Sequence, residues 1–412
     1  MRVLLVTDNY SPNRDGVATS VASLASGLRE SSHDVAVVAP RARASAPAVE
    51  YRTYLAPSFA TGQGGFRLAW VSSRTLERLV EQHRPDVVHI HTLGSLGLQA
   101  ARLCRRANLK SVFTWHTDLL AYREAYPVLK LGIPAIYAST FLPQEKRAVG
   151  KALGATMKTA LAGESVTPHH RRMLSNVAGL FDRVIVPSHK TAAELKEIAP
   201  FCVPTVIPSA AVRHGTLSVP LARRLKEMRK LIHCDGTAIA YVGRLSAEKN
   251  LETLLHAMAR RVLPAVPGAR LNIIGDGHRQ KYERMAESLG ISHAVAFAGP
   301  APPELVGHLL SSCGLLAHPS LTETQGLVIA EAALVGLPAV VLDADLEGVV
   351  QHDHTGYVAA SVDRFGAALV RLLQRPDIRN RLGANARSVA AEYTSARYAS
   401  RVVDVYDELV PR

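Results

Sequence analysis

Residues 315–338 read LLAHPSLTETQGLVIAEAALVGLP, and this stretch decides the fold. Its apolar start, Leu315 to Ala317, predicts a buried strand, and the polar loop that follows leads into a helical pattern beginning near Leu327. A strand that delivers a loop to a helix N-terminus offers unpaired amide groups and the positive end of a helix dipole. Together these can hold a phosphate.

Two carboxylates accompany this helix. Glu323 precedes it, and Glu331 lies about one turn inside it. Because carboxylates accept hydrogen bonds from hydroxyls, a pair beside a diphosphate site suits a sugar nucleotide, with its ribose and hexose hydroxyls. The alternative is that Glu323 is a solvated loop residue and Glu331 a surface residue of the helix, since most carboxylates are exposed.

Composition and periodicity favour two α/β domains. The chain has 412 residues, of which 48% are apolar and only 5% aromatic, as buried parallel strands require. Apolar strands alternate with helical segments on both sides of a connector near residues 200–208, which predicts two parallel sheets. In such sheets ligands bind at the carboxyl ends of strands, where Asp8, His91 and His116 fall.

Histidine at a strand end has a structural and a functional interpretation. His89 belongs to the apolar alternation of its strand, which favours a structural role. His116 opens the polar run His116-Thr117-Asp118, and both interpretations stay open for it.

A loop in the second half carries two cations. Arg244 and Lys249 lie in GRLSAEKN, residues 243–250, between a predicted strand and a predicted helix. They are well placed to neutralise a diphosphate. The tripeptide Asp343-Ala344-Asp345 could chelate a metal, but its position after a strand favours a turn, and the cations already supply positive charge.

Positive charge is concentrated in the first half. The net charge is +13, and residues 101–180 contain 12 Lys and Arg against 4 Asp and Glu. This asymmetry indicates an anionic partner, and a membrane surface, a nucleic acid or an acidic acceptor would satisfy it. Residues 119–180 are helical in pattern and basic, and they form either a solvated helix face or an interfacial amphipathic helix. Nucleic acid is disfavoured, because no aromatic residues interleave with the basic ones to stack bases.

Nothing in the sequence predicts membrane insertion. No apolar run reaches the 18 residues of a spanning helix, and the apolar N-terminal segment is too short for a signal peptide. The four cysteines are scattered, and we interpret them as buried apolar residues in a reducing compartment. We therefore expect a cytoplasmic protein.

The chain resembles the retaining glycosyltransferases of family 4. The resemblance covers nearly the whole length, and its most specific parts are DNYSPNRDGVATSV (residues 8–21), GRLSAEKN and PSLTETQGLVIAEA (residues 319–332). It implies the GT-B fold, an α/β architecture of two Rossmann-like parallel-sheet domains facing a cleft. The expected domains are an N-terminal acceptor domain, residues 1–200, joined by a C-terminal helix, residues 393–412, and a nucleotide-sugar donor domain, residues 201–392.

The same resemblance implies roles for individual residues. Arg244 and Lys249 look like the pair that holds the donor diphosphate, with Gly16 approaching it. Glu331 looks like the acceptor for the ribose hydroxyls, Glu323 like the carboxylate facing the transferred sugar, and His116 like the residue that touches the sugar near the reacting carbon. The expected catalytic set is His116, Glu323, Arg244 and Lys249, and the backbone amides of four residues would complete the donor site: Thr324, Gln325, Gly326 and Leu327.

The reaction implied is transfer of a hexose from a nucleotide-diphosphate sugar to a hydroxyl, with retention of configuration and without a metal or other cofactor. DGVATSV and His116-Thr117-Asp118, followed by Tyr122 and Tyr126, look most like members that glycosylate lipids such as diacylglycerol or phosphatidylinositol. With residues 101–180, this predicts peripheral binding to the inner face of an anionic membrane. The alternatives are a soluble enzyme glycosylating an aminocyclitol or nucleoside, and a non-catalytic nucleotide-sugar-binding protein.

Overall fold

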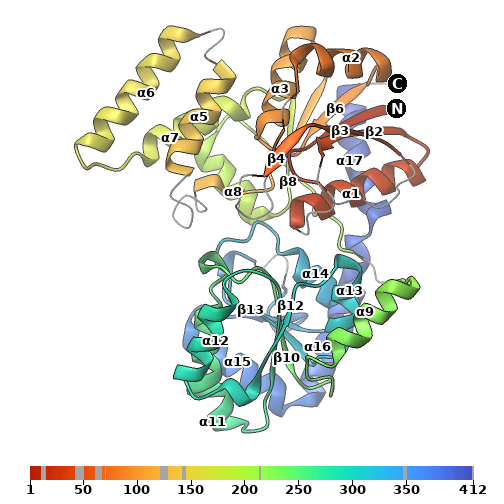
Figure 1. Ribbon diagram of the computed structural model, residues 1–412, viewed down its shortest axis with the longest axis vertical. Coiled ribbons are helices and arrows are strands. Elements are labelled where there is room, and N and C mark those ends of the chain that lie inside the picture. The colour runs from red at the N-terminus through yellow and green to blue at the C-terminus, as the bar shows by residue number, and fades with distance from the viewer. Residues whose placement is uncertain are drawn as a thin grey trace. The chain divides into compact units, whose positions relative to one another are not determined.

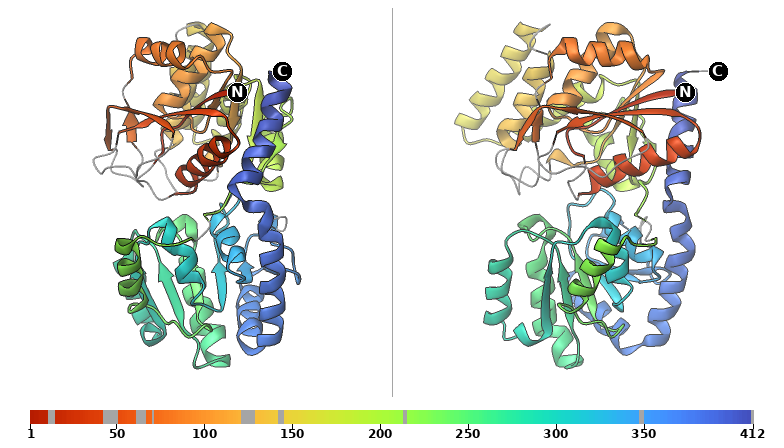
Figure 2. Two further views of the ribbon diagram at one scale, coloured as in Figure 1. Left: turned by 90° about the vertical axis from the view of Figure 1, so that its right-hand side faces the viewer. Right: turned by 45° about the vertical axis from the view of Figure 1, so that its right-hand side comes forward.

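The computed structural model describes residues 1–10, 15–41, 51–60, 67–69, 71–120, 129–141, 145–212, 215–346 and 350–410. Tyr122 and Tyr126 lie outside the described residues. The chain divides into two compact units, drawn in Figures 1 and 2. Unit 1 comprises Met1–Ala210 with Ser395–Arg412, and unit 2 comprises Ala211–Thr394.

Unit 1 contains a parallel sheet of seven strands in the order β3-β2-β1-β6-β7-β8-β9. Two short strands form a separate antiparallel pair, β4 (Ser58–Ala60) and β5 (Arg67–Ala69). The strands of the large sheet are β1 (Arg2–Val6), β2 (Asp34–Pro40), β3 (Arg52–Ala56), β6 (Val87–Ile90), β7 (Ser111–Thr114), β8 (Arg183–Val186) and β9 (Thr205–Val206).

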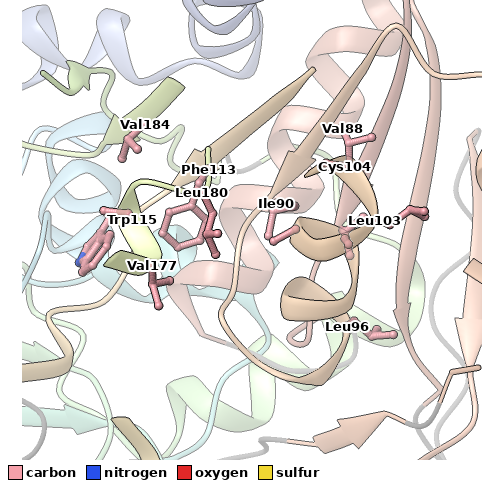
Figure 3. Packing of buried hydrophobic residues seen from close by; sticks show 14 of the residues in the cluster. Val88, Ile90, Leu96, Leu103, Cys104, Phe113, Trp115, Val177, Leu180 and Val184 are labelled. Carbon is pink, nitrogen blue, oxygen red and sulfur yellow. The ribbon is translucent and has the colours of Figure 1, made fainter. Parts of the chain in front are cut away.

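Successive side chains of these strands enter opposite layers, as the pleat requires. Val3 and Leu5 pack with α1 (Gly16–Glu30) and α17 (Ser395–Leu409), whereas Leu4 and Val6 face the other layer. Figure 3 shows part of that second layer, where Ile90 lies beside residues of α3 and Phe113 lies beside Leu180. The helices on that side are α2 (Ser73–His83), α3 (Ser95–Ala107), α5 (Leu129–Phe141), α7 (Thr167–Ala178) and α8 (His189–Ile198), with α6 (Lys146–Leu161) packed on α5 and α7.

Unit 2 contains a second parallel sheet, of six strands in the order β12-β11-β10-β13-β14-β15. Its strands are β10 (Ile239–Val242), β11 (Leu271–Ile274), β12 (Val295–Gly299), β13 (Leu315–His318), β14 (Ala339–Val341) and β15 (Gly356–Val358). The side chains of α10 (Leu251–Ala257), α12 (Arg279–Ser288), α15 (Val362–Gln374) and α16 (Pro376–Val389) pack in one layer, and those of α9 (Val219–Arg229), α13 (Pro303–Leu310) and α14 (Leu327–Leu334) in others.

The expected α/β architecture of two parallel sheets is confirmed. The helix predicted after the GRLSAEKN loop is α10, followed by a π-helix, Met258–Val262, and a short helix, α11 (Leu263–Ala265). The expectation for the cysteines is only partly right, because Cys104 and Cys313 are buried but Cys234 is exposed. Within the described part of the chain, no helix combines the length and the apolar character needed to cross a bilayer.

Candidate active site

The centre of unit 2 is β13, which pairs with β10 on one side and β14 on the other. Parallel strands end at the same edge of a sheet, so the loops after β10 and β13 emerge side by side. The loop after β13 ends at Gly326, whose φ of 72° is the left-handed conformation that glycine adopts without strain. There α14 begins, at Leu327 as the sequence predicts, and its first amides have no carbonyl partner within the helix.

The two loops are joined by an ion pair between Lys249 and Glu323. Both side chains are largely buried, with 15% and 13% of their surface exposed. A third group, the ring of His318, has its Nε2 atom 3.5 Å from Glu323 Oε1. Burial raises the pKa of Glu323, but the ammonium of Lys249 and the ring of His318 lower it more, so its pKa lies well below the usual range. Glu323 is therefore an ionised, buried carboxylate and not a solvated loop residue.

Arg244 is held within its own loop by the carboxylate of Glu248, a residue that the sequence did not single out. Its Nη2 atom lies 3.0 Å from Glu248 Oε1, and the same oxygen accepts a hydrogen bond of 2.6 Å from Ser246. The Glu248 side chain is only 2% exposed. The spacing of four residues between Arg244 and Glu248 is the one signal in the sequence that could have found this pair, but in a loop such spacing predicts no contact.

Backbone contacts tie the two loops together as well. The hydroxyls of Ser320 and Thr322 each donate to the carbonyl of Glu248 at 3.3 Å, and the Asn250 side chain donates to the carbonyl of Pro319 at 3.0 Å. Arg244, Lys249 and Glu323 thus belong to one hydrogen-bonded body at the carboxyl edge of the sheet. Fixed donors of this kind can stabilise charge without reorganising when it appears.

Glu331 lies on α14, eight residues after Glu323, and is 8% exposed. It forms no ion pair with any described residue. Burial alone raises its pKa, to about 8, so the carboxyl is mostly protonated near neutral pH. Glu331 is therefore not the surface residue of the alternative interpretation. Thr324 and Gln325 lie in the loop before α14, and Leu327 is the first residue of the helix.

The Asp343-Ala344-Asp345 segment forms a turn, in which the amide of Asp345 donates to Asp343 Oδ1 at 3.0 Å. Among the residues that the structure describes, no group of three or more His, Cys, Asp or Glu side chains is arranged to hold a metal ion.

In unit 1, Gly16 is the first residue of α1 and is exposed. The helix is capped by Asp15, whose carboxylate accepts the amide of Ala18 at 3.0 Å. The loop residues directly before Asp15, numbers 11–14, lie outside the described part of the chain. Gly16 thus stands at an exposed helix N-terminus and brings no side chain of its own to it.

Asp8 lies at the carboxyl end of its strand, as the sequence predicts, and its role there is structural. Its carboxylate is fully buried and accepts the amides of Leu96 and Gly97, at 2.7 and 3.1 Å, and the hydroxyl of Thr92 at 2.7 Å. These are the orphan donors at the start of α3, so Asp8 caps that helix. The proximity of Asp8 also explains Gly94, where an added Cβ would lie 2.4 Å from Asp8 Cγ.

His116 follows β7 and is partly buried. Its Nε2 atom lies 3.0 Å from Nδ1 of His91, and burial lowers its pKa to about 4, which keeps the ring neutral. His89 has both ring nitrogens satisfied, by the Tyr406 hydroxyl at 2.6 Å and the Thr114 hydroxyl at 2.7 Å. Its expected structural role agrees with these contacts.

Models of known protein families match both units of the chain. The model of Glycosyltransferase Family 4 matches residues 14–213, and the model of Glycosyl transferases group 1 matches residues 225–389. The chain is a family 4 glycosyltransferase with the GT-B fold. This glycosyltransferase is accordingly an enzyme of hexosyl transfer, and the alternative of a non-catalytic binding protein is set aside.

Its relatives include enzymes with lipid and with small polar acceptors in their names. The chain is 24% identical to alpha-monoglucosyldiacylglycerol synthase of Acholeplasma laidlawii over 100% of this chain and 98% of that one. It is 29% identical to D-inositol 3-phosphate glycosyltransferase of Corynebacterium jeikeium over 63% of this chain and 65% of that one.

Solved structures share the fold at low sequence identity. A sucrose-phosphate synthase from Thermosynechococcus elongatus superimposes with a TM-score of 0.73 at 17% identity, covering 99% of both chains. HepE of Anabaena in complex with UDP-glucose gives 0.67 at 15% identity, covering 98% of this chain and 99% of that one.

Proposed function

We propose that this glycosyltransferase moves a hexose from a nucleotide-diphosphate sugar to a hydroxyl of a membrane lipid, of the diacylglycerol or phosphatidylinositol kind, with retention of configuration. The observation that carries the donor half is the joined pair of loops holding Arg244 and Lys249 beside the start of α14. A guanidinium, an ammonium and the N-terminal turn of a helix are all groups that bind phosphate oxygens.

The donor diphosphate gains negative charge as the bond to the sugar breaks. Lys249 has three N–H donors, so it can bind a phosphate oxygen while keeping Glu323. Arg244, fixed by Glu248, presents its remaining N–H groups to the same anion. In this proposal Glu323 faces the sugar, Glu331 accepts the ribose hydroxyls, and His116 and Gly16 are the contributions of unit 1.

A direct test is a panel of sugar nucleotides. The cognate donor at a hundred times its Kd should raise the free energy of unfolding by about 2.7 kcal/mol, and only that donor should support glycosylation of diacylglycerol or phosphatidylinositol in detergent. The anomeric configuration of the product is read by NMR. A donor that shifts the melting temperature but yields no glycolipid with either lipid contradicts the proposed acceptor, and the absence of any shift across the panel contradicts the donor site.

The acceptor half is supported by the surface of α6. Val149 and Thr156 bury one side of this helix, and the other side carries a basic band and an apolar band. Met157 and Leu161 are 60% and 81% exposed. The helix has no Asp or Glu between its ends, and its exposed basic residues are Lys146, Arg147, Lys151 and Lys158. Such a surface suits the headgroup region of an anionic bilayer.

We expect the protein to sediment with vesicles of anionic phospholipid at low salt and to be released at high salt. The double variant K151E/K158E should weaken this binding by at least about 30-fold, because each basic residue contributes about 1 kcal/mol at an anionic surface. The matched control is R223E/K226E, the same charge change on exposed residues of α9. Equal loss in both double variants would contradict the assignment to α6.

A second candidate, transfer to a small soluble polyol phosphate, is favoured by the similarity to D-inositol 3-phosphate glycosyltransferase. The two candidate functions differ in their acceptor. The soluble acceptor is supported if the enzyme glycosylates inositol phosphates without lipid and does not sediment with anionic vesicles.

A further inference from the structure

Three histidine rings of unit 1 lie in series at the carboxyl edge of its sheet. The centroids of His89 and His91 are 4.2 Å apart with 26° between the ring planes, and those of His91 and His116 are 5.3 Å apart with 22° between the planes. The middle ring is 1% exposed. His89 is in turn fixed by Tyr406 of α17 and by Thr114 of β7. The plane of the His91 ring is thus set by a neighbour that cannot rotate freely.

The two nitrogens of His91 have different surroundings. Nδ1 lies 3.0 Å from Nε2 of His116, whereas Nε2 is buried and has no hydrogen-bond partner. A neutral imidazole carries one proton, so placing it on Nε2 would leave a buried N–H unsatisfied. Placing it on Nδ1 makes the hydrogen bond to His116 and leaves only a lone pair without a partner. Orphaned buried N–H groups are the rarer case, which favours the proton on Nδ1.

We propose that His91 is a positioning residue that donates its Nδ1–H to Nε2 of His116 and so holds His116 in one orientation and one tautomer, with its own proton on Nδ1. The catalytic consequence rests on the proposed role of His116 at the sugar, because a ring fixed by its neighbour meets the substrate without first reorienting. The tautomer itself rests only on the contacts within unit 1.

The side chain of His91 combines a hydrogen bond to His116 with a stacked ring, and two substitutions remove these features differently. A leucine would fill much of the same volume but would leave Nε2 of His116 without its donor. An asparagine carries an N–H at the same distance from Cβ as Nδ1 of histidine, so it can restore the hydrogen bond while losing the stacked ring. The two substitutions therefore separate hydrogen bonding from packing.

The test is the tautomer of His116, read from the 15N chemical shifts of protein labelled at histidine, with the His116 signals assigned from H116Q. In the wild type and in H91N, Nε2 of His116 should be unprotonated and Nδ1 protonated. In H91L the tautomers should mix, kcat should fall about tenfold and the KM for the donor should stay within twofold, with H91N recovering most of kcat.

The control is H83L, since His83 is a buried histidine of the same unit that has one bonded and one unpartnered nitrogen but no contact with this stack. It should leave the His116 shifts unchanged. A wild-type His116 protonated on Nε2, or an unchanged tautomer in H91L, overturns the proposal. A tautomer change in a protein inactive with every donor instead supports the positioning by His91 and contradicts the proposed function.

Discussion

Replacing Lys249 with methionine is expected to lower kcat/KM by about 10³, the cost of losing one preorganised donor to a developing anion. Lys249 is the most buried cation of the joined loops, and methionine keeps the length of its apolar stem while removing the charge. The fall should appear mainly in kcat, because the negative charge on the diphosphate is greatest as the sugar departs. Steady-state kinetics with the cognate donor measure the effect.

The same substitution also removes the partner of a buried carboxylate. Breaking such a pair leaves Glu323 uncompensated and should lower the free energy of unfolding by about 3 kcal/mol. The double variant K249M/E323Q replaces both charges by neutral groups of similar size and should recover most of that stability in urea unfolding, while remaining inactive. If K249M/E323Q is stable and inactive, the loss of activity on removing Lys249 is not caused by unfolding.

The matched control is K281M, which breaks the ion pair of Lys281 with Glu252 in the same unit. That pair is 49% and 42% exposed and should contribute no more than about 1 kcal/mol. K281M should leave kcat/KM within twofold of the wild type. Full activity of K249M, or an equal loss in K281M, would remove Lys249 from the proposed diphosphate site.

The sequence predicts the buried strands and helices of this fold better than the strands at the sheet edges. β13 extends only one residue beyond its predicted run, and α14 begins where the sequence predicts, because both are apolar runs bounded by Gly, Pro or polar residues. The edge strands β3 and β15 escaped prediction. A strand with one neighbour buries less of its surface, and β15 has only three residues, too few to show a period.

The candidate site was predicted less completely than the fold. Sequence identifies the cations and carboxylates of the two loops, but pairing is a property of three-dimensional contact. Nothing in GRLSAEKN says that Glu248 holds Arg244 while Glu323, from another strand, holds Lys249. Likewise the position of Asp8 at a strand end is visible in the sequence, whereas its use as the cap of α3 depends on backbone amides that lie close to it only in the fold.

Glu331 should make unit 2 less stable as the pH rises. The pKa of its buried carboxyl is about 8, against 4.5 for an exposed glutamate. Between these values the folded state keeps a proton that the unfolded chain has released, so stability is full below pH 4.5, falls as the pH approaches 8 and is constant above it. The difference corresponds to roughly 4 kcal/mol. E331Q cannot ionise and should lose this dependence, becoming more stable than the wild type at pH 8 by about that amount and equal to it near pH 4.5.

E323Q supplies a control of opposite sign. The pKa of Glu323 is held below its usual range by Lys249 and His318 despite burial, so its contribution to stability is present above pH 4.5 and is lost as the pH falls through the folded-state value. At pH 8, E323Q should therefore be less stable than the wild type, where E331Q is more stable. Urea unfolding of the three proteins at pH 5 and pH 8 measures both effects.

The gain in stability of E331Q should come with a loss of donor binding. Ribose hydroxyls that donate to Glu331 favour its ionised form, which accepts through two charged oxygens, whereas a carboxamide accepts through one neutral oxygen. In E331Q the shift in melting temperature caused by the cognate donor should therefore shrink, with Kd rising about tenfold. A residue that serves binding at a cost in stability should behave in this way: replacing it makes the protein more stable and weakens donor binding. Stability at pH 8 equal to that of the wild type, with donor affinity unchanged, would assign Glu331 to neither role.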